Sequence, residues 1–537
     1  MSEIQVEVCF TDKLESVRVG GKGMEIPKAV KAKPVEEWFE PAAGRVKWGG
    51  LGAEIKEMDF NGEKDATYSF LFNGPEDKKQ EFMECVERFC LGEEAQQETK
   101  KKTVQDYLQE AKKNQQAGNA EMAFQQYMVA ARDYGHPEAQ FEVARCYQNG
   151  TGVEKNEENA VVWYKKAAEQ GYAEAQKKLG DCYNYGTGVA KDLEQAFECY
   201  RKAAEQGNAR AQNNLGVCYM KGSGIAKGPV QAAEWYARAA EQGLARAQYN
   251  LGYCYKTGEG VEKDPKKAAM WCEKAAEQGI AVAQYYLGCC YEDGKGVTKD
   301  LARAAEWYRK AAESGNVKAQ FALGKCYYDG NGTEMNYSEA VKWYRKAAEQ
   351  GDANAQNMFG YCYEYGYGVA QNEEEAVKWY RKSAEQGYAD AQYNLAELLL
   401  WKDGEEAFKW YQKAAKQGHA GAQNGLGFCY EEPDKEMEMM EIDIYPSVGV
   451  EKDSAKAVEW YRKAAEQGLD SAQYQLGRCY EGGHGVTKDL TKAAEWYQKA
   501  ADKGYDKKLL QGCDVGSAVA AGAALAVTGL IWKILRG

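Results

Sequence analysis

The chain has 537 residues, of which 44% are hydrophobic, and its formal net charge is −13. The hydrophobic content is that of folded proteins and excludes wholesale disorder. The acidic balance argues against a nucleic-acid partner, because proteins that bind nucleic acids present Lys and Arg to the phosphates. The first residues, MSEIQVEVCF, lack the basic start and the apolar run of a secretory signal. We therefore expect a cytoplasmic protein whose cysteines stay reduced.

Residues 1–100 are predicted to form a small α+β domain, because they do not match the pattern that follows them. The stretch 52–72, GAEIKEMDFNGEKDATYSFLF, indicates a β-hairpin, since Asn61 and Gly62 favour a tight turn between strand-like runs. Pro75 is a favourable first residue for a helix after the hairpin. No motif in this domain identifies a chemistry.

Residues 137–505 form ten consecutive units of one repeat, most of them 36 residues long. The common form is A-x-A-Q-x-x-L-G-x-C-Y-x-x-G-x-G-V-x-K-D-x-x-x-A-x-x-W-Y-x-K-A-A-E-Q-G-x. Unit 389–419 is shorter than the others, and unit 420–469 is longer. Residues 101–136 are predicted to be a helical pair that caps the array, because its first repeat has no preceding neighbour to cover it. The predicted fold is mainly α, an α/α solenoid of about ten helix-turn-helix repeats.

The unit 281–316 illustrates why each repeat is expected to contain two helices. Its first helix carries one apolar stripe at helical spacing, formed by Ala283, Leu287, Cys290 and Tyr291. The Gly-x-Gly that follows breaks this helix, and Asp300 is placed to cap the second one. Gly315 occupies a position that is glycine in all ten units, as a helix C-terminus with positive φ requires.

One cysteine recurs in nine of the ten units, on the apolar stripe of the first helix. Zinc needs ligands that converge on one site, whereas these thiols are spread along the array, and a buried free Cys behaves as a small hydrophobe. We expect packing residues, with no metal and no cofactor, at Cys146, Cys182, Cys218, Cys254, Cys290, Cys326, Cys362, Cys429 and Cys479.

The stretches AEAQKKLGDCYNYGTGVAKD and AVKWYRKAAEQG closely resemble the Sel-one-like repeat, a relative of the tetratricopeptide repeat. The resemblance covers residues 137–505 and implies an α/α superhelix with a concave face, in a family that acts mainly as scaffolds and adaptors. Some secreted bacterial relatives are linked to β-lactam binding, but they carry paired cysteines that bridge neighbouring helices. That pairing is missing from this sequence, so the activity is not carried over.

In related superhelices the first helix of each unit lines the concave face. Here the outward positions of these helices carry aromatic and amide side chains, which suit a protein or peptide partner because Tyr gives large contact area and Asn can pair with a backbone. The alternative is that several of them pack against the adjacent unit. The predicted partner-binding residues are Asn213, Asn214, Tyr249, Asn250, Tyr253, Tyr285, Tyr286, Phe321, Asn357 and Tyr361.

The C-terminal segment 506–537 contains an uncharged run of eighteen residues at 515–532, flanked by basic residues. As a helix the run would span about 27 Å, close to the hydrocarbon thickness of a bilayer. It indicates either a membrane anchor or an Ala-rich helix that covers the last repeat. The acidic, Met-containing insertion 431–446 is likewise open to two interpretations, a binding loop or a solvated loop without function.

No arrangement typical of catalysis stands out, and the three histidines of the chain, at 136, 419 and 484, are scattered. We predict no catalytic residues and no enzymatic activity. Two functional classes remain. The first is a scaffold that binds a protein or peptide in its groove, with or without a membrane tether. The alternative is an enzyme or an enzyme-regulatory subunit whose chemistry lies in residues 1–100.

Overall fold

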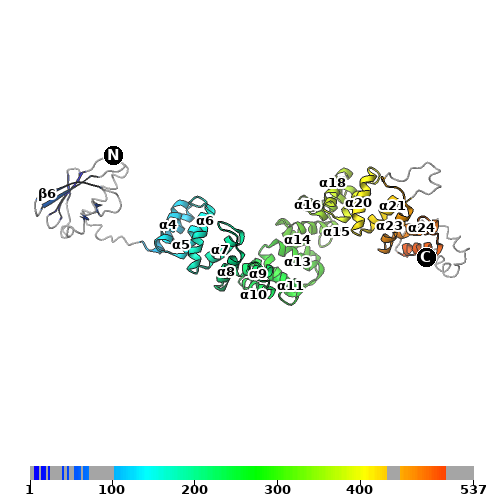
Figure 1. Ribbon diagram of the computed structural model, residues 1–537, viewed down its shortest axis with the longest axis horizontal. Coiled ribbons are helices and arrows are strands. Elements are labelled where there is room, and N and C mark those ends of the chain that lie inside the picture. The colour runs from blue at the N-terminus through cyan, green and yellow to red at the C-terminus, as the bar shows by residue number, and fades with distance from the viewer. Residues whose placement is uncertain are drawn as a thin grey trace. The chain divides into compact units, whose positions relative to one another are not determined.

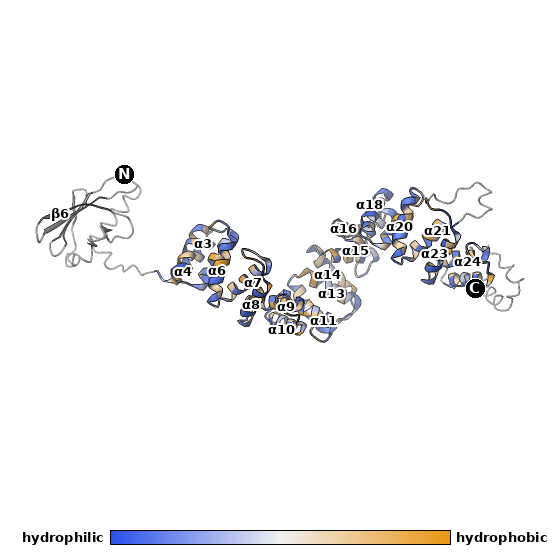
Figure 2. Cartoon of the chain, in the orientation of Figure 1, coloured by the Kyte–Doolittle hydropathy of each residue, from blue (hydrophilic) through white to orange (hydrophobic). Residues whose placement is uncertain are grey.

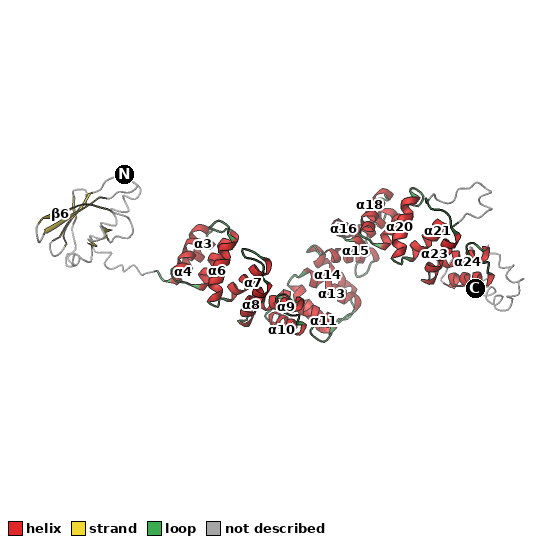
Figure 3. Ribbon diagram, viewed as in Figure 1, coloured by secondary structure: helices red, strands yellow, loops and turns green. Residues whose placement is uncertain are grey.

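The computed structural model describes residues 102–431 and 448–502, together with seven strands between residues 5 and 71. The chain divides into two units, Met1–Lys191 and Asp192–Gly537. In Figure 3 the described strands are confined to the N-terminal part, and helices make up nearly all of the rest.

The N-terminal strands form one antiparallel sheet in the order β3-β2-β1-β7-β6-β5-β4. They are β1 (Gln5–Phe10), β2 (Leu14–Val19), β3 (Lys22–Met24), β4 (Phe39–Glu40), β5 (Arg45–Val46), β6 (Glu54–Asn61) and β7 (Asp65–Leu71). The predicted hairpin is present as β6 and β7, with Asn61 opposite Asp65, so its connection is residues 62–64 and not a two-residue turn. The helix expected after Pro75 lies outside the described residues, so the α+β class of this domain stays a prediction.

Two helices per repeat make the rest of the fold a mainly α solenoid, as predicted (Figure 1). The pair α3 (Val104–Gln116) and α4 (Ala120–Arg132) precedes the repeats. The first helices of the repeats are α5 (Pro137–Asn149), α7 (Ala173–Tyr185), α9 (Ala209–Lys221), α11 (Ala245–Thr257), α13 (Ala281–Asp293), α15 (Val317–Asp329), α17 (Ala353–Tyr365), α19 (Ala389–Leu399), α21 (Ala420–Tyr430) and α24 (Asp470–Gly482). The second helices are α6 (Glu157–Glu169), α8 (Leu193–Glu205), α10 (Pro229–Glu241), α12 (Pro265–Glu277), α14 (Leu301–Glu313), α16 (Tyr337–Glu349), α18 (Glu373–Glu385), α20 (Gly404–Lys416), α23 (Ser454–Glu466) and α25 (Leu490–Asp502).

The ends of the helices are fixed by the residues that the repeat holds constant. The carboxylate of Asp300 accepts a hydrogen bond from the Arg303 amide at 3.0 Å and so caps α14, as predicted. Gly294 ends α13 with a left-handed φ of +71°. At Gly296 a Cβ would lie 2.0 Å from the carbonyl oxygen of Pro265 in the preceding repeat, so only glycine allows this close approach.

The interior between the helices is built from small residues and from one large ring per repeat. Alanines and the repeat cysteines are buried on both helices, while each helix also carries hydrophilic residues (Figure 2). The ring of Tyr308 lies against Gly288, where a Cβ would come within 2.5 Å of the ring carbons. The glycine of the first helix therefore makes room for the Tyr of the second, and the same contact recurs at Gly216, Gly324, Gly360, Gly427 and Gly477.

Glutamines link the two helices of a repeat to each other and link the repeat to the one before it. The Nε2 of Gln278 donates to the Oε1 of Gln248 at 2.8 Å, and the Nε2 of Gln248 donates to the carbonyl oxygen of Ala240 at 3.3 Å. The same contact between glutamines recurs along the array, with the donors Gln170, Gln242, Gln350, Gln386, Gln417 and Gln467. The Gln residues of the repeat thus satisfy each other's amides in the interior.

Two expectations of the sequence fall on residues that are not described. Most of the insertion 431–446 and the whole run 515–532 lie outside the described residues. Among the helices of the described part, none has the length and the apolar character needed to cross a membrane.

Candidate functional site

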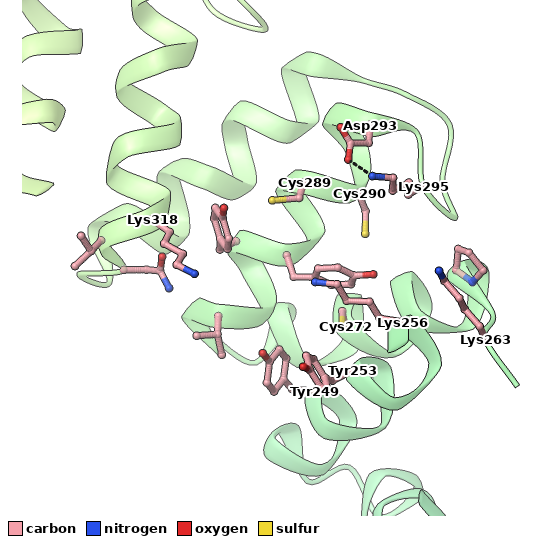
Figure 4. A pocket seen from close by; sticks show the side chains of 16 residues that line it. Tyr249, Tyr253, Lys256, Lys263, Cys272, Cys289, Cys290, Asp293, Lys295 and Lys318 are labelled. Atoms are coloured by element: carbon pink, nitrogen blue, oxygen red, sulfur yellow. Dashed lines mark hydrogen bonds and ion pairs between the residues drawn. The ribbon is translucent and has the colours of Figure 1, made fainter. Parts of the chain in front are cut away.

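A pocket of about 820 Å³ lies at repeats 245–280 and 281–316 and at the start of α15 in the next repeat, within the second unit of the chain (Figure 4). Its aromatic lining comes from the first helices α11 and α13, which contribute Tyr249, Tyr253, Tyr285 and Tyr286. Cys272 of α12 adds a thiol that lies between Tyr249 and Tyr253 on one side and Cys289 and Cys290 on the other in the view of Figure 4. Four of the predicted partner-binding residues are therefore brought together in one hollow.

The pocket coincides with a single departure from the repeat. Nine of the ten second helices carry Tyr after the position that is usually Trp, and α12 alone carries a cysteine there, Cys272. In the next repeat the corresponding Tyr308 is buried and donates its hydroxyl hydrogen bond to Glu292. The residue that corresponds to Glu292 is Lys256, so both members of the Tyr–Glu pair are replaced in the repeat 245–280.

The ring of Tyr249 consequently lacks the partner that its counterparts have. In five other repeats an aromatic residue at this first-helix position packs on the second-helix Tyr, with ring centroids 5.5 to 6.2 Å apart. An example is Tyr285, whose centroid is 5.8 Å from that of Tyr308. Tyr249 has Cys272 at the corresponding place and lines the pocket.

The outer part of the pocket is basic. Lysines 256, 263, 295 and 318 line it together with one acid, Asp293, whose carboxylate is 2.7 Å from the Nζ of Lys295. The Nζ of Lys256 lies 4.3 Å from the centroid of the Tyr286 ring, a cation–π contact. Lys263 and Lys318 lie on opposite sides of the pocket in Figure 4.

Two predicted site residues are placed differently from the expectation. Asn213 and Asn357 are buried, with 4% and 7% of their surface exposed, so the expectation that they face outward is wrong. Asn250 donates to the Oδ1 of Asn213 at 2.9 Å, and Asn394 donates to the Oδ1 of Asn357 at 3.0 Å. These bonds join neighbouring first helices, so the amides that we assigned to a partner backbone hold the repeats together.

The remaining predicted residues lie at other places along the first helices. Asn214 is half-buried on α9. Phe321 packs its ring 5.8 Å from that of Tyr344 and lines a smaller pocket next to the first. Tyr361 belongs to a separate aromatic cluster, with its ring 4.6 Å from that of Tyr365 and 6.0 Å from that of Tyr367. The ten predicted residues do not form one site.

The repeat cysteines are buried, as predicted. Burial raises the pKa of most of these thiols to about 11 or 12, and it raises the pKa of Cys272 to about 12. The thiols are therefore protonated at neutral pH, in the form that packs as a small apolar group.

The profile of the Sel1 repeat family matches residues 137–172, 173–208, 209–244, 245–280, 281–316, 317–352, 353–388, 389–419, 445–469 and 470–505. The chain belongs to the Sel1 repeat family. Of the long unit that we delimited at 420–469, the family profile matches only the second part. Sel1 repeat proteins are typically non-enzymatic interaction scaffolds that bind protein partners.

The chain is similar to solved Sel1 repeat proteins. The protective antigen c5321 of uropathogenic Escherichia coli, which has the SLR fold, is 34% identical with a TM-score of 0.72, over 82% of this chain and 93% of the antigen. A Sel1 repeat protein from Oxalobacter formigenes is 38% identical with a TM-score of 0.41, over 45% of this chain and 96% of that one. Comparison with curated proteins gave no significant match.

A second departure from the Sel1 consensus adjoins the first. The glutamine that ends the second helix is replaced by Ser314 in the repeat 281–316. The Oε1 of Gln284, which this glutamine would reach, is buried and has no hydrogen-bond partner. The two departures, at Cys272 and at Ser314, lie in consecutive repeats, and of the two residues only Cys272 lines the pocket.

Sequence reasoning missed Cys272 and the three lysines 256, 263 and 318 as parts of the site. The available signal was the departure from Tyr at one unit, which stands out only when the repeats are compared with one another position by position. The predicted partner residues all come from first-helix positions that we expected to face outward, whereas Cys272 is a buried residue of a second helix.

Proposed function

We propose that this chain is a scaffold that binds a protein or peptide segment at the pocket formed by α11, α12 and α13. The observation that carries the proposal is the gathering of Tyr249, Tyr253, Tyr285 and Tyr286 around a hollow of about 820 Å³. This volume is within the range of about 300–1,000 Å³ for ligand sites, and interface energy concentrates in aromatic anchors. Tyr253 is 45% exposed, so its ring is accessible to a partner.

The test compares proteins retained by full-length wild-type chain and by two variants, with quantitative mass spectrometry. Tyr253→Ala removes an accessible ring from the pocket, and we expect it to weaken retention of specific partners by about tenfold. The control is Glu306→Ala with Arg309→Ala, two exposed residues of α14 outside the pocket. Equal retention by the tyrosine variant and the wild type, or equal losses in both variants, would contradict the proposal.

A membrane tether is a separate part of the proposal, and it rests on the sequence of residues 515–532. Their uncharged run and basic flanks support an anchor that leaves the repeats in the cytoplasm. The intact chain should then sediment with membranes and resist carbonate extraction, and deletion of residues 506–537 should release it. Intact chain that stays in solution without detergent would show that the tail is no anchor.

A further inference from the structure

The pocket lacks a ring that nearly every other repeat supplies from within. In five of those repeats the second-helix Tyr packs on an aromatic ring of the first helix, as Tyr308 does on Tyr285. Cys272 is much smaller than Tyr, and although its own surface is fully buried, it belongs to the lining of the pocket. An aromatic side chain from outside would find Tyr249 and Tyr286 as neighbours, and aromatic pairs favour offset or edge-on contact at about 4.5–7 Å between centroids.

We propose that the pocket binds an aromatic side chain of an acidic peptide segment, whose ring takes the place of the tyrosine that Cys272 replaces. This inference deepens the proposed function, since it names the chemistry of the partner at the same site. Cys272 is then the residue that determines which repeat accepts the ring.

The positive charge of the pocket lining favours acidic residues on both sides of the aromatic residue in the peptide. Among the described residues, Lys256, Lys263 and Lys318 form no ion pair, whereas the lining acid Asp293 is already paired with Lys295. The chain as a whole carries −13, so this basic lining is a local exception. Carboxylates on both sides of the aromatic residue would meet these lysines, and like charges would be repelled.

The surface around the pocket is long enough for an extended segment. A second hollow of about 700 Å³ shares Lys263 and Pro265 with the pocket, and a third of about 390 Å³ shares Tyr285, Cys289 and Lys318. The three hollows therefore adjoin one another across neighbouring repeats. This row of hollows favours a peptide over a small aromatic acid, which would need only the central one.

The experiment measures fluorescence anisotropy of a labelled peptide with one central Phe between Asp and Glu residues, added to the full chain. We expect saturable binding, weakened by about tenfold or more when the Phe is Ala or when the acids are Lys. Cys272→Tyr restores the residue of the other repeats, so it should keep or raise thermal stability while it weakens binding by a similar factor.

A matched pair of lysine variants tests the charge. Lys263 and Lys299 hold the same position in consecutive repeats, but only Lys263 lines the pocket. Lys263→Gln should weaken binding of the acidic peptide several-fold, and Lys299→Gln should leave it unchanged. Salt should reduce the difference between the two variants because the contact is electrostatic.

Several outcomes would overturn the inference. These are no binding at peptide concentrations of about 1 mM, equal binding of the Phe and Ala peptides, and undiminished binding to the Cys272→Tyr variant. Displacement of the peptide by ATP or phenylacetate at equal affinity would assign the pocket to a small molecule instead. If the peptide fails while Tyr253→Ala still abolishes partner retention, the scaffold function stands and only the partner chemistry is wrong.

Discussion

The repeats 245–280 and 281–316 have the same length and nearly the same consensus, yet they differ at the second-helix position that faces the glycine of the first helix. In the second, Tyr308 lies against Gly288, packs on Tyr285 and donates to Glu292. In the first, the much smaller side chain of Cys272 faces Gly252, where a Cβ would be 2.6 Å from the Sγ. A buried position of the second helix therefore distinguishes the pocket of about 820 Å³ beside Cys272 from the smaller hollow of about 390 Å³ beside Tyr308.

The largest loss of stability is expected when the repeat 281–316 is given the cysteine of the repeat 245–280. Tyr308→Cys removes a fully buried ring and its bond to Glu292, so it should destabilise the array by about 3 kcal/mol. Urea unfolding with a constant m-value checks the change. Cys272→Ala, which removes only a thiol, should cost about 1 kcal/mol. If Tyr308→Cys lowers the free energy of unfolding by less than Cys272→Ala does, the Tyr308 ring does not stabilise the repeat.

The two glycines that face these side chains should respond differently. At Gly288 a new Cβ would lie 2.5 Å from the ring of Tyr308, and crowding of this kind costs about 1–3 kcal/mol. At Gly252 the nearest atom is the Sγ of Cys272, the single end atom of a short side chain and not part of a ring. Gly288→Ala should therefore lower the midpoint of urea unfolding clearly more than Gly252→Ala. Equal shifts would show that the space beside Cys272 is not available.

The contacts between glutamines offer a stabilising change in the repeat 281–316. Ser314→Gln would place a donor near the unpaired Oε1 of Gln284, as Gln278 donates to Gln248 one repeat earlier. One such bond should add about 1 kcal/mol to the free energy of unfolding. Gln278→Ser is the matched reverse change and should cost a similar amount. If Ser314→Gln leaves the free energy of unfolding unchanged, the Oε1 of Gln284 has another hydrogen-bond donor.

The smallest expected effect is the pH dependence that Cys272 adds. Burial raises the pKa of its thiol to about 12 from the ordinary 9.0, so the thiol contributes stability below pH 9 that is lost between pH 9 and about 12. Between pH 8 and about 9.5 the wild type should lose roughly 0.8 kcal/mol more than Cys272→Ala. Unfolding free energies measured at both pH values check this. Identical losses would show that the thiol is hydrated in the folded chain.

Most of the fold could be predicted because the constant positions of the repeat each indicate one structural role, such as a helix cap or a buried residue. Gly315 has φ +85°, Asp300 caps its helix, and the repeat cysteines are buried, each as its position in the common form indicated. The sequence could not show which positions of a first helix contact the neighbouring repeat and which are exposed. Asn213 and Asn250 are 37 residues apart and meet only because neighbouring repeats stack, so helical periodicity within one unit did not separate a free face from a covered one.

The site was predictable in part for the same reason. Tyr249, Tyr253, Tyr285 and Tyr286 were identified by their residue type on outward positions, and they line the pocket. Cys272 was not identified, because the second-helix position is buried in every unit. Its effect depends on the volume that is missing there, which only the packing of three helices reveals.

The central claim is that an aromatic side chain from a partner enters the pocket beside Cys272. Photo-crosslinking tests it most directly, with the acidic peptide carrying benzoylphenylalanine in place of its Phe and the site mapped by mass spectrometry of the full chain. The account predicts crosslinks within α11, α12 and α13, between residues 245 and 293, and their loss in the Cys272→Tyr variant. Crosslinks at the tyrosine cluster of α17, or crosslinks that persist unchanged in Cys272→Tyr, would contradict it.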